Sequence, residues 1–228
     1  MHLEAVRERI AQAAKRAGRD PGEVRIVAVT KTHPVEVVRR AAAEGLLDVG
    51  ENRVQEALAK QDSWPDAPVR WHLIGHLQRN KAKLAAGRFA LIHSLDSVRL
   101  ADALEAAAAA KNEVQDVLVQ VNVAREEQKD GCAPEEAEGL VAHALKLPHL
   151  AVRGMMAMAP FTDDVAVQRA TFKGLRELKE RLQPAHGAPR TAHPWELSMG
   201  MSADFEIAVE EGATLLRLGT VLFGEREP

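Results

Sequence analysis

Short β-branched runs alternate with longer helical segments along this chain, and this alternation limits its fold more than any other feature. The apolar runs typical of strands are eight in number and cover residues 25–30, 47–50, 69–74, 90–93, 116–122, 150–155, 195–198 and 214–218. Units of about 25–30 residues fit a closed (β/α)₈ barrel. An open doubly wound sheet usually has only about five or six strands.

Both ends of the first strand agree with a barrel. Before it, Leu3, Val6 and Ile10 recur at helical spacing and predict an amphipathic helix. After it, the loop Lys31–Pro34 contains no glycine, whereas dinucleotide-binding sheets carry a glycine-rich turn there. We therefore expect an α/β protein in which residues 1–228 form a single TIM-type (β/α)₈ barrel domain with an additional N-terminal helix.

Charge and cysteine content argue against several classes of protein. The net charge of -3 provides no strong positive field for nucleic acid. No apolar run reaches the roughly 18 residues of a membrane span. A single cysteine, Cys132, cannot form an intramolecular disulfide, and no neighbouring cation or base would activate its thiol. We expect a cytoplasmic protein that binds neither nucleic acid nor membrane.

A lysine stands where a barrel of this type would place its active site, at the carboxyl end of a strand. Lys31 shares strand parity with Val27 and Val29, so its side chain leaves the strand on the face that those residues pack. Partial loss of solvent in a barrel mouth favours the neutral amine, which can attack an aldehyde. Position alone equally allows a lysine that extends into solvent at a strand end.

The loops after the last two strands carry an anion-binding pattern. The segment 198–204 places serine hydroxyls and backbone N–H groups at the start of a helix, although simple capping by Ser202 would explain part of this pattern. Gly219 and Thr220 follow the final strand, where glycine allows a close approach and threonine adds a hydroxyl. Barrel phosphate sites commonly use these two loops. A lysine opposite a phosphate site favours pyridoxal 5′-phosphate (PLP) over other cofactors.

Two histidines resemble a zinc motif only in their spacing. His72 and His76 are four residues apart, but His72 lies in a predicted strand and Gly75 interrupts any helix, so we predict no metal site. His76 is expected to lie near the cofactor rim, and His72 is expected to be packed and hydrogen-bonded. The methionines within 155–158 are typical of adaptable packing, or of a wall against a flat ring.

Five stretches between the first and last strands resemble the PLP homeostasis proteins, a family related to the barrel domain of alanine racemases. Together they are highly specific and span essentially the whole chain, with no clear departure at the matched positions. The stretches are Val27–Thr32, Gly50–Glu56, Trp71–Lys81, Leu197–Asp204 and Arg217–Gly224.

This resemblance implies a PLP site and assigns residues to it. Lys31 would hold the cofactor as a Schiff base, and Arg217 would face the pyridine nitrogen. Because an arginine stays protonated, it disfavours protonation of that nitrogen, and the site should stabilise carbanions weakly. The residues assigned to the phosphate are Ser202, Gly219 and Thr220, with Ser198 near them. Those assigned to the pocket wall are Asn52, His76 and Met155. No residue is assigned to catalysis.

Three functions remain open. The first is a PLP-binding protein that buffers the cofactor and delivers it to PLP-dependent apoenzymes, with no robust turnover. The second is a racemase-like enzyme, but the chain contains no tyrosine to act as the second base, which leaves only one-base chemistry through Lys31. The third is a barrel that binds another phosphorylated metabolite without a covalent bond. The chain ends soon after the eighth strand, without a racemase β domain, so we expect a monomer.

Overall fold

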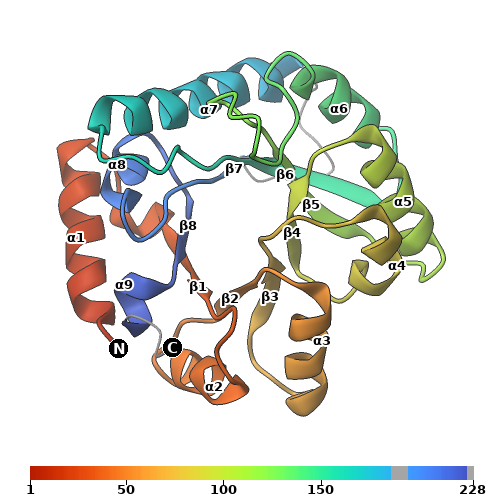
Figure 1. The fold of residues 1–228 in the computed structure, drawn as a ribbon, viewed down its shortest axis with the longest axis horizontal. Helices are drawn as coiled ribbons and strands as arrows, with labels where there is room; N and C mark the ends of the chain where they lie inside the picture. Colours follow the sequence, from red (N-terminus) through yellow and green to blue (C-terminus); the bar gives the residue numbers. More distant parts are fainter. Residues whose placement is uncertain (186–194, 225–228) are drawn as a thin grey trace.

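The computed structural model describes residues 1–185 and 195–224, and its strands close into a barrel (Figure 1). All neighbouring strands pair in parallel and in sequence order, and β1 pairs with β8 to complete the ring. The strands are β1 (Arg25–Val29), β2 (Asp48–Glu51), β3 (Arg70–Leu73), β4 (Leu91–Leu95), β5 (Gln115–Gln120), β6 (Leu150–Met156), β7 (Glu196–Ser198) and β8 (Leu215–Leu218). The predicted (β/α)₈ barrel is confirmed.

Helices surround the barrel, and the predicted extra helix at the N-terminus lies beside α8 and α9 (Figure 1). Arg9 and Arg16 tie it to α8 through ion pairs with Glu206 and Glu210. Among the described residues, no helix is both long and apolar enough to cross a membrane. The α-helices are α1 (Leu3–Arg16), α2 (Val35–Ala43), α3 (Val54–Ser63), α4 (Ala82–Ala85), α5 (Val98–Ala109), α6 (Ala137–Ala144), α7 (Val165–Ala185), α8 (Phe205–Glu210) and α9 (Thr220–Phe223), and the 3₁₀ turns are η1 (Pro21–Glu23) and η2 (Arg79–Lys81).

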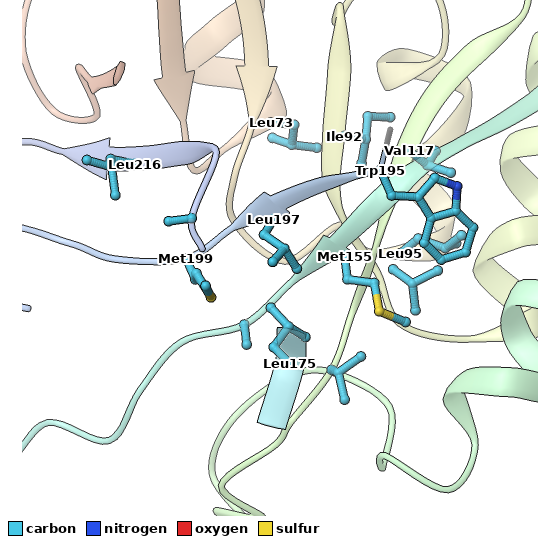
Figure 2. Close-up of a cluster of buried hydrophobic side chains, with 14 of the residues drawn as sticks. Leu73, Ile92, Leu95, Val117, Met155, Leu175, Trp195, Leu197, Met199 and Leu216 are labelled. Atoms are coloured by element: carbon cyan, nitrogen blue, oxygen red, sulfur yellow. The ribbon is translucent and has the colours of Figure 1, made fainter. Parts of the chain in front are cut away.

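Strand alternation divides the buried apolar side chains into two layers. The outer layer packs strand residues against helix residues, and Figure 2 shows part of it around Leu197 and Leu175. The inner layer lies within the barrel and joins residues from five strands: Val27, Leu91, Leu118, Met156 and Leu215. Residues with the parity of the inner layer therefore face the barrel axis, and those near the carboxyl ends of the strands face its mouth.

Candidate functional site

Lys31 lies just beyond β1, at the mouth of the barrel. Val27 belongs to the inner layer and Ala28 to the outer layer, so alternation places the side chain of residue 31 on the inner side. The strand ladder continues to Thr30, whose N–H donates to the carbonyl of Gly50. Lys31 is half-buried. The structure thus places Lys31 just past the carboxyl end of β1, and the inward direction of its side chain stays a prediction.

A second lysine, Lys60 of α3, holds the backbone immediately before Lys31. Its ammonium donates to the carbonyl oxygen of Thr30 at 2.8 Å, to Oε1 of Glu51 at 2.7 Å and to Oε1 of Glu56 at 2.9 Å. The hydroxyl of Thr30 also donates to Glu51, at 2.6 Å. These bonds anchor the residue before Lys31 to β2 and α3.

The residue after Lys31 is held by the same cluster. The N–H of Thr32 donates to Oε1 of Glu56 at 2.5 Å. Thr32 has a φ of 65°, a left-handed conformation that β-branched residues rarely adopt and that persists only where its surroundings impose it. Lys31 therefore extends from a backbone that is fixed on both sides, which reduces the entropy lost when its amine is placed.

Burial and charge act in opposite directions on the two carboxyls of this cluster. Burial raises the pKa of Glu51, and the hydrogen bonds from Lys60 and Thr30 offset it only in part. At Glu56 burial also acts upward, but the bonds from Lys60 and the Thr32 N–H outweigh it and lower the pKa. The Lys60 ammonium thus donates hydrogen bonds to the carboxyls of Glu51 and Glu56 and to the carbonyl of Thr30.

The structure brings the two predicted phosphate loops together. The hydroxyl oxygen of Ser202 accepts the N–H of Val221 at 3.2 Å, which joins the loop after β7 to the turn after β8. Gly219 lies against Val29, because a Cβ built on it would be 3.4 Å from the Val29 Cβ. Thr220 is exposed beside it. The loops therefore meet close to the strand end that carries Lys31.

Gly200 shapes the loop that contains Ser202, and alanine at this position should distort it. Its φ is 93°, and a Cβ there would lie 2.6 Å from the Cβ of Ala208. We expect Gly200→Ala to lower the free energy of unfolding by about 2 kcal/mol, from backbone strain and overpacking combined. Urea unfolding measures this change.

Gly18→Ala provides the matched control for that prediction. Gly18 also has a positive φ, of 66°, but a Cβ there meets nothing within 4 Å. Its substitution should cost about 1 kcal/mol, from conformation alone. Equal losses in the two variants would contradict a steric role for Gly200.

Arg217 of β8 points into the barrel below Lys31. It pairs in register with Val27, four residues before Lys31, which corresponds to about 13 Å along the strand. Its guanidinium donates to the hydroxyl of Ser198 at 2.7 Å and to the carbonyl of Ala157 at 3.0 Å. Burial lowers the pKa of Arg217 to about 10, so it stays protonated at neutral pH. Within the described residues no carboxylate forms an ion pair with it.

Ser198 lies under Arg217 and does not take part in the contact between the phosphate loops. It is the last residue of β7 and fully buried, and its hydroxyl also bonds to Nδ1 of His93 at 2.8 Å. The expectation that Ser198 lies near the phosphate came from the family resemblance. Its parity instead turns the hydroxyl into the barrel.

A row of polar groups continues from Ser198 across the barrel interior. His93 Nε2 lies 2.9 Å from Nδ1 of His72, and Nε2 of His72 lies 2.9 Å from Oδ1 of Asp48. The prediction that His72 is packed and hydrogen-bonded is confirmed. We call the five residues of this row the interior network, namely Arg217, Ser198, His93, His72 and Asp48.

The interior network predicts a loss of stability in mild acid. Burial holds the pKa of His93 well below its ordinary 6.5, and the nearby charge of Arg217 acts in the same direction. His93 therefore takes up a proton in the unfolded chain at a pH at which it stays neutral in the native state. The free energy of unfolding consequently falls as the pH drops below about 6.5. This one group should lower the free energy of unfolding by about 1.4 kcal/mol between about pH 7.5 and 5.5.

Urea unfolding across this range measures the slope, and His93→Gln isolates its source because glutamine does not titrate. The variant should show a shallower dependence on pH. Asp48 acts only at lower pH: burial would raise its pKa, but bonds from His72 and Arg70 hold it well below its ordinary value. Identical slopes for the wild type and His93→Gln would refute the assignment.

The placement of Met155 was wrong. It lies in the outer layer with residues of the helices, and Figure 2 shows it in a group with Leu95, Leu175 and Leu197. The register between β5 and β6 shifts just before Gly154, and the parity that follows turns residue 155 outward. Met156 belongs to the inner layer and Met158 packs against it, so these two methionines lie on the inner side.

The remaining predicted residues lie at the rim. Asn52 is half-buried, and its carbonyl oxygen would be 2.4 Å from a Cβ on residue 75, which explains the glycine there. His76 is 44% exposed, with Nδ1 at 3.3 Å from Asp96 and 3.4 Å from Asp130. Away from these residues, burial raises the pKa of the Cys132 thiol to about 12, in agreement with the expectation that it is unreactive.

Two residues of the site, His93 and Lys60, were not identified from the sequence. His93 was treated only as part of a strand, although its parity with Leu91 places it inside the barrel. Lys60 was not singled out, although its spacing of four residues from Glu56 is typical of an ion pair on a helix. Strand parity could have indicated that His93 lies inside the barrel, and helical spacing could have indicated the pair of Lys60 with Glu56. Neither signal indicates the contact of His93 with Ser198 or that of Lys60 with Thr30.

This chain matches a known family along almost its whole length. A family model described as alanine racemase, N-terminal domain, matches residues 1–227. A protein of Aquifex aeolicus named pyridoxal phosphate homeostasis protein is 46% identical over 225 residues, which are 99% of this chain and 97% of that protein.

Solved structures agree with this match. PipY of Synechococcus elongatus, solved with PLP bound, is similar with a TM-score of 0.81 and 38% identity, over 94% of this chain and 100% of that one. An alanine racemase of Clostridium difficile is similar with a TM-score of 0.76 at 16% identity, over 97% of this chain and 60% of the racemase. The racemase likeness concerns the fold alone.

Proposed function

This chain belongs to the family of pyridoxal phosphate homeostasis proteins, and from that membership we propose that it binds PLP through Lys31. When bound, the cofactor supplies an aldehyde that condenses reversibly with a lysine amine. The observation that supports this proposal is the register of β1 with β8, in which buried Arg217 pairs with Val27, four residues before Lys31. The loops of Ser202 and Gly219 close the same mouth.

The residues present fit the cofactor chemically. Arg217 is a buried cation that bonds to Ser198 and Ala157, two neutral oxygens, and Arg has five N–H groups to donate. A ring nitrogen that accepts a hydrogen bond suits the donors that remain. The Ser202 hydroxyl, the Gly219 backbone and the Thr220 hydroxyl would bind the phosphate, while Asn52 and His76 line the rim.

We propose that the protein carries PLP and delivers it to PLP-dependent apoenzymes, without robust turnover of its own. Arg217 stays charged, so it keeps the ring nitrogen unprotonated and weakens the cofactor as an electron sink. The chain has no tyrosine for a second base. The name of the Aquifex relative, a homeostasis protein, supports the same role.

Identification of the bound ligand tests this proposal most directly. The purified protein should be yellow, and mass spectrometry after gentle denaturation should detect PLP. A colourless protein that also fails to change its absorbance with added PLP would rule out both the carrier and the racemase. A different phosphorylated metabolite in the released fraction would favour non-covalent binding.

Turnover separates the carrier from the enzyme. The PLP-loaded protein is incubated with alanine and other amino acids, and the products are resolved by chiral chromatography. We expect no sustained interconversion of enantiomers. Repeated turnover that disappears with Lys31→Ala would overturn the carrier assignment and establish one-base chemistry.

A further inference from the structure

We propose that the interior network is a positioning device that holds the Arg217 guanidinium under the cofactor, with both of its histidines neutral and protonated at Nε2. Its bonds form an unbroken row from Arg217 to Asp48. The part that concerns PLP rests on the proposed function. The arrangement of protons is a property of the protein without its cofactor.

The two ends of the row set the direction of its hydrogen bonds. Arg217 can only donate, so the Ser198 oxygen accepts from it. Asp48 is ionised and can only accept, so Nε2 of His72 must carry a proton. The protons on the two bonds between these ends remain to be placed.

One arrangement satisfies every group. If His72 is neutral, its bare Nδ1 accepts from Nε2–H of His93. The bare Nδ1 of His93 then accepts from the hydroxyl of Ser198, which in turn accepts from Arg217. Every bond donates toward Asp48, and no donor or acceptor in the row opposes another.

The alternative leaves a buried hydroxyl without an acceptor. If His72 were an imidazolium, its Nδ1–H would donate to His93, and Nδ1–H of His93 would then point at Ser198. The Ser198 oxygen would face two donors, and within the described part of the chain it has no other side-chain partner to receive its own proton. A buried unpaired donor is costly.

Burial strengthens this preference. The exposed fractions of His72, His93 and Ser198 are 2%, 0% and 0%. The network already contains one buried cation, Arg217, and a second nearby would add repulsion in a low-dielectric interior. At the other end, Arg70 and Arg25 lie at 2.6 Å and 3.8 Å from the Asp48 carboxylate. The single negative charge at that end is therefore already compensated.

The consequence for the cofactor site is a fixed guanidinium. Two N–H groups of Arg217 are held by Ser198 and by the carbonyl of Ala157, so the plane of the group and the direction of its other N–H groups are set. Loss of the Ser198 hydroxyl would release one of these two bonds. Charge-assisted bonds of this kind are among the stronger hydrogen bonds in proteins.

The tautomers are tested on the cofactor-free protein by ¹⁵N NMR of the imidazole rings. At neutral pH we expect His72 and His93 each to show one bare Nδ1 and one protonated Nε2. An imidazolium signature on either ring, or an Nδ1–H tautomer, would overturn the proposal. This result does not depend on whether the protein binds PLP.

Ser198→Ala tests the link to the cofactor, with Ser94→Ala as its matched control. Ser94 is also fully buried, but its hydroxyl has no hydrogen-bond partner among the described residues. Ser198→Ala should shift the His93 Nδ1 resonance and weaken PLP binding about tenfold. Ser94→Ala should leave the resonance in place and change affinity by less than about twofold.

The outcomes distinguish failure of the positioning role from failure of the proposed PLP binding through Lys31. Wild-type affinity in a folded Ser198→Ala protein would overturn the positioning role, as would equal losses in the two variants. If Ser198→Ala fails to fold, the wild-type tautomers decide alone. If the wild type shows the expected tautomers but binds no PLP at Lys31, the proposed function fails and the proton arrangement stands.

Discussion

Lys31→Ala is expected to abolish covalent capture of PLP and to leave the barrel intact. Lys31 lies beyond the last strand pair of β1, so the substitution removes the amine and disturbs no strand pair. The yellow absorbance should disappear, and the apparent affinity should fall about a hundredfold, which corresponds to about 3 kcal/mol. Absorbance titration with PLP measures both effects.

Borohydride reduction and peptide mapping of the wild type complete this test. The adduct should be found on Lys31 and not on Lys60, the neighbouring buried lysine, because the Lys60 ammonium bonds to three oxygens. Lys146→Ala removes an exposed lysine and should bind PLP as the wild type does. An adduct on another lysine, or an unchanged titration of Lys31→Ala, would invalidate the assignment.

Lys60→Ala should destabilise the protein by about 4 kcal/mol. Lys60 is buried, and its removal leaves Glu51, which is fully buried, without a cationic partner. Breaking a buried ion pair by deleting one member costs more than the pair contributes, because the other charge loses both water and partner. The backbone before Lys31 loses its anchor as well, so PLP affinity should also fall. Urea unfolding gives the first value and PLP titration the second.

A second substitution identifies the cause of this loss. Glu51→Gln added to Lys60→Ala removes the unpaired charge and should restore about 1 kcal/mol or more. Lys111→Ala removes a lysine that donates to the carbonyl of Ala86 near the surface, and it should cost less than about 1 kcal/mol. A double variant less stable than Lys60→Ala alone would contradict the buried-charge explanation.

The barrel and the rim of the site were predictable because both follow from local periodicity. Alternation within residues 25–31 determines on which side Lys31 leaves the strand. Barrels also place their phosphate loops after the last two strands, and the contact between Ser202 and Val221 has this arrangement. These predictions needed no knowledge of which side chains touch across the barrel.

The error at Met155 and the omission of His93 share a physical cause, which is the register between strands. Met155 faces outward because β5 and β6 slip near Gly154, and nothing in the local sequence indicates that slip. The link from His93 to Ser198 joins residues 105 positions apart, and it exists only when the strands close with this stagger. Parity could place both side chains inside the barrel but could not pair them.

The β1–β8 closure has a consequence for how cofactor and fold depend on each other. Lys31 and Arg217 come from the first and last strands, so a ligand held by both spans the seam at which the ring is completed. A nascent chain cannot bring Lys31 and Arg217 together until β8 has paired with β1. A ligand bound by both residues would stabilise the closed barrel relative to one opened between β1 and β8, and so would oppose local unfolding there.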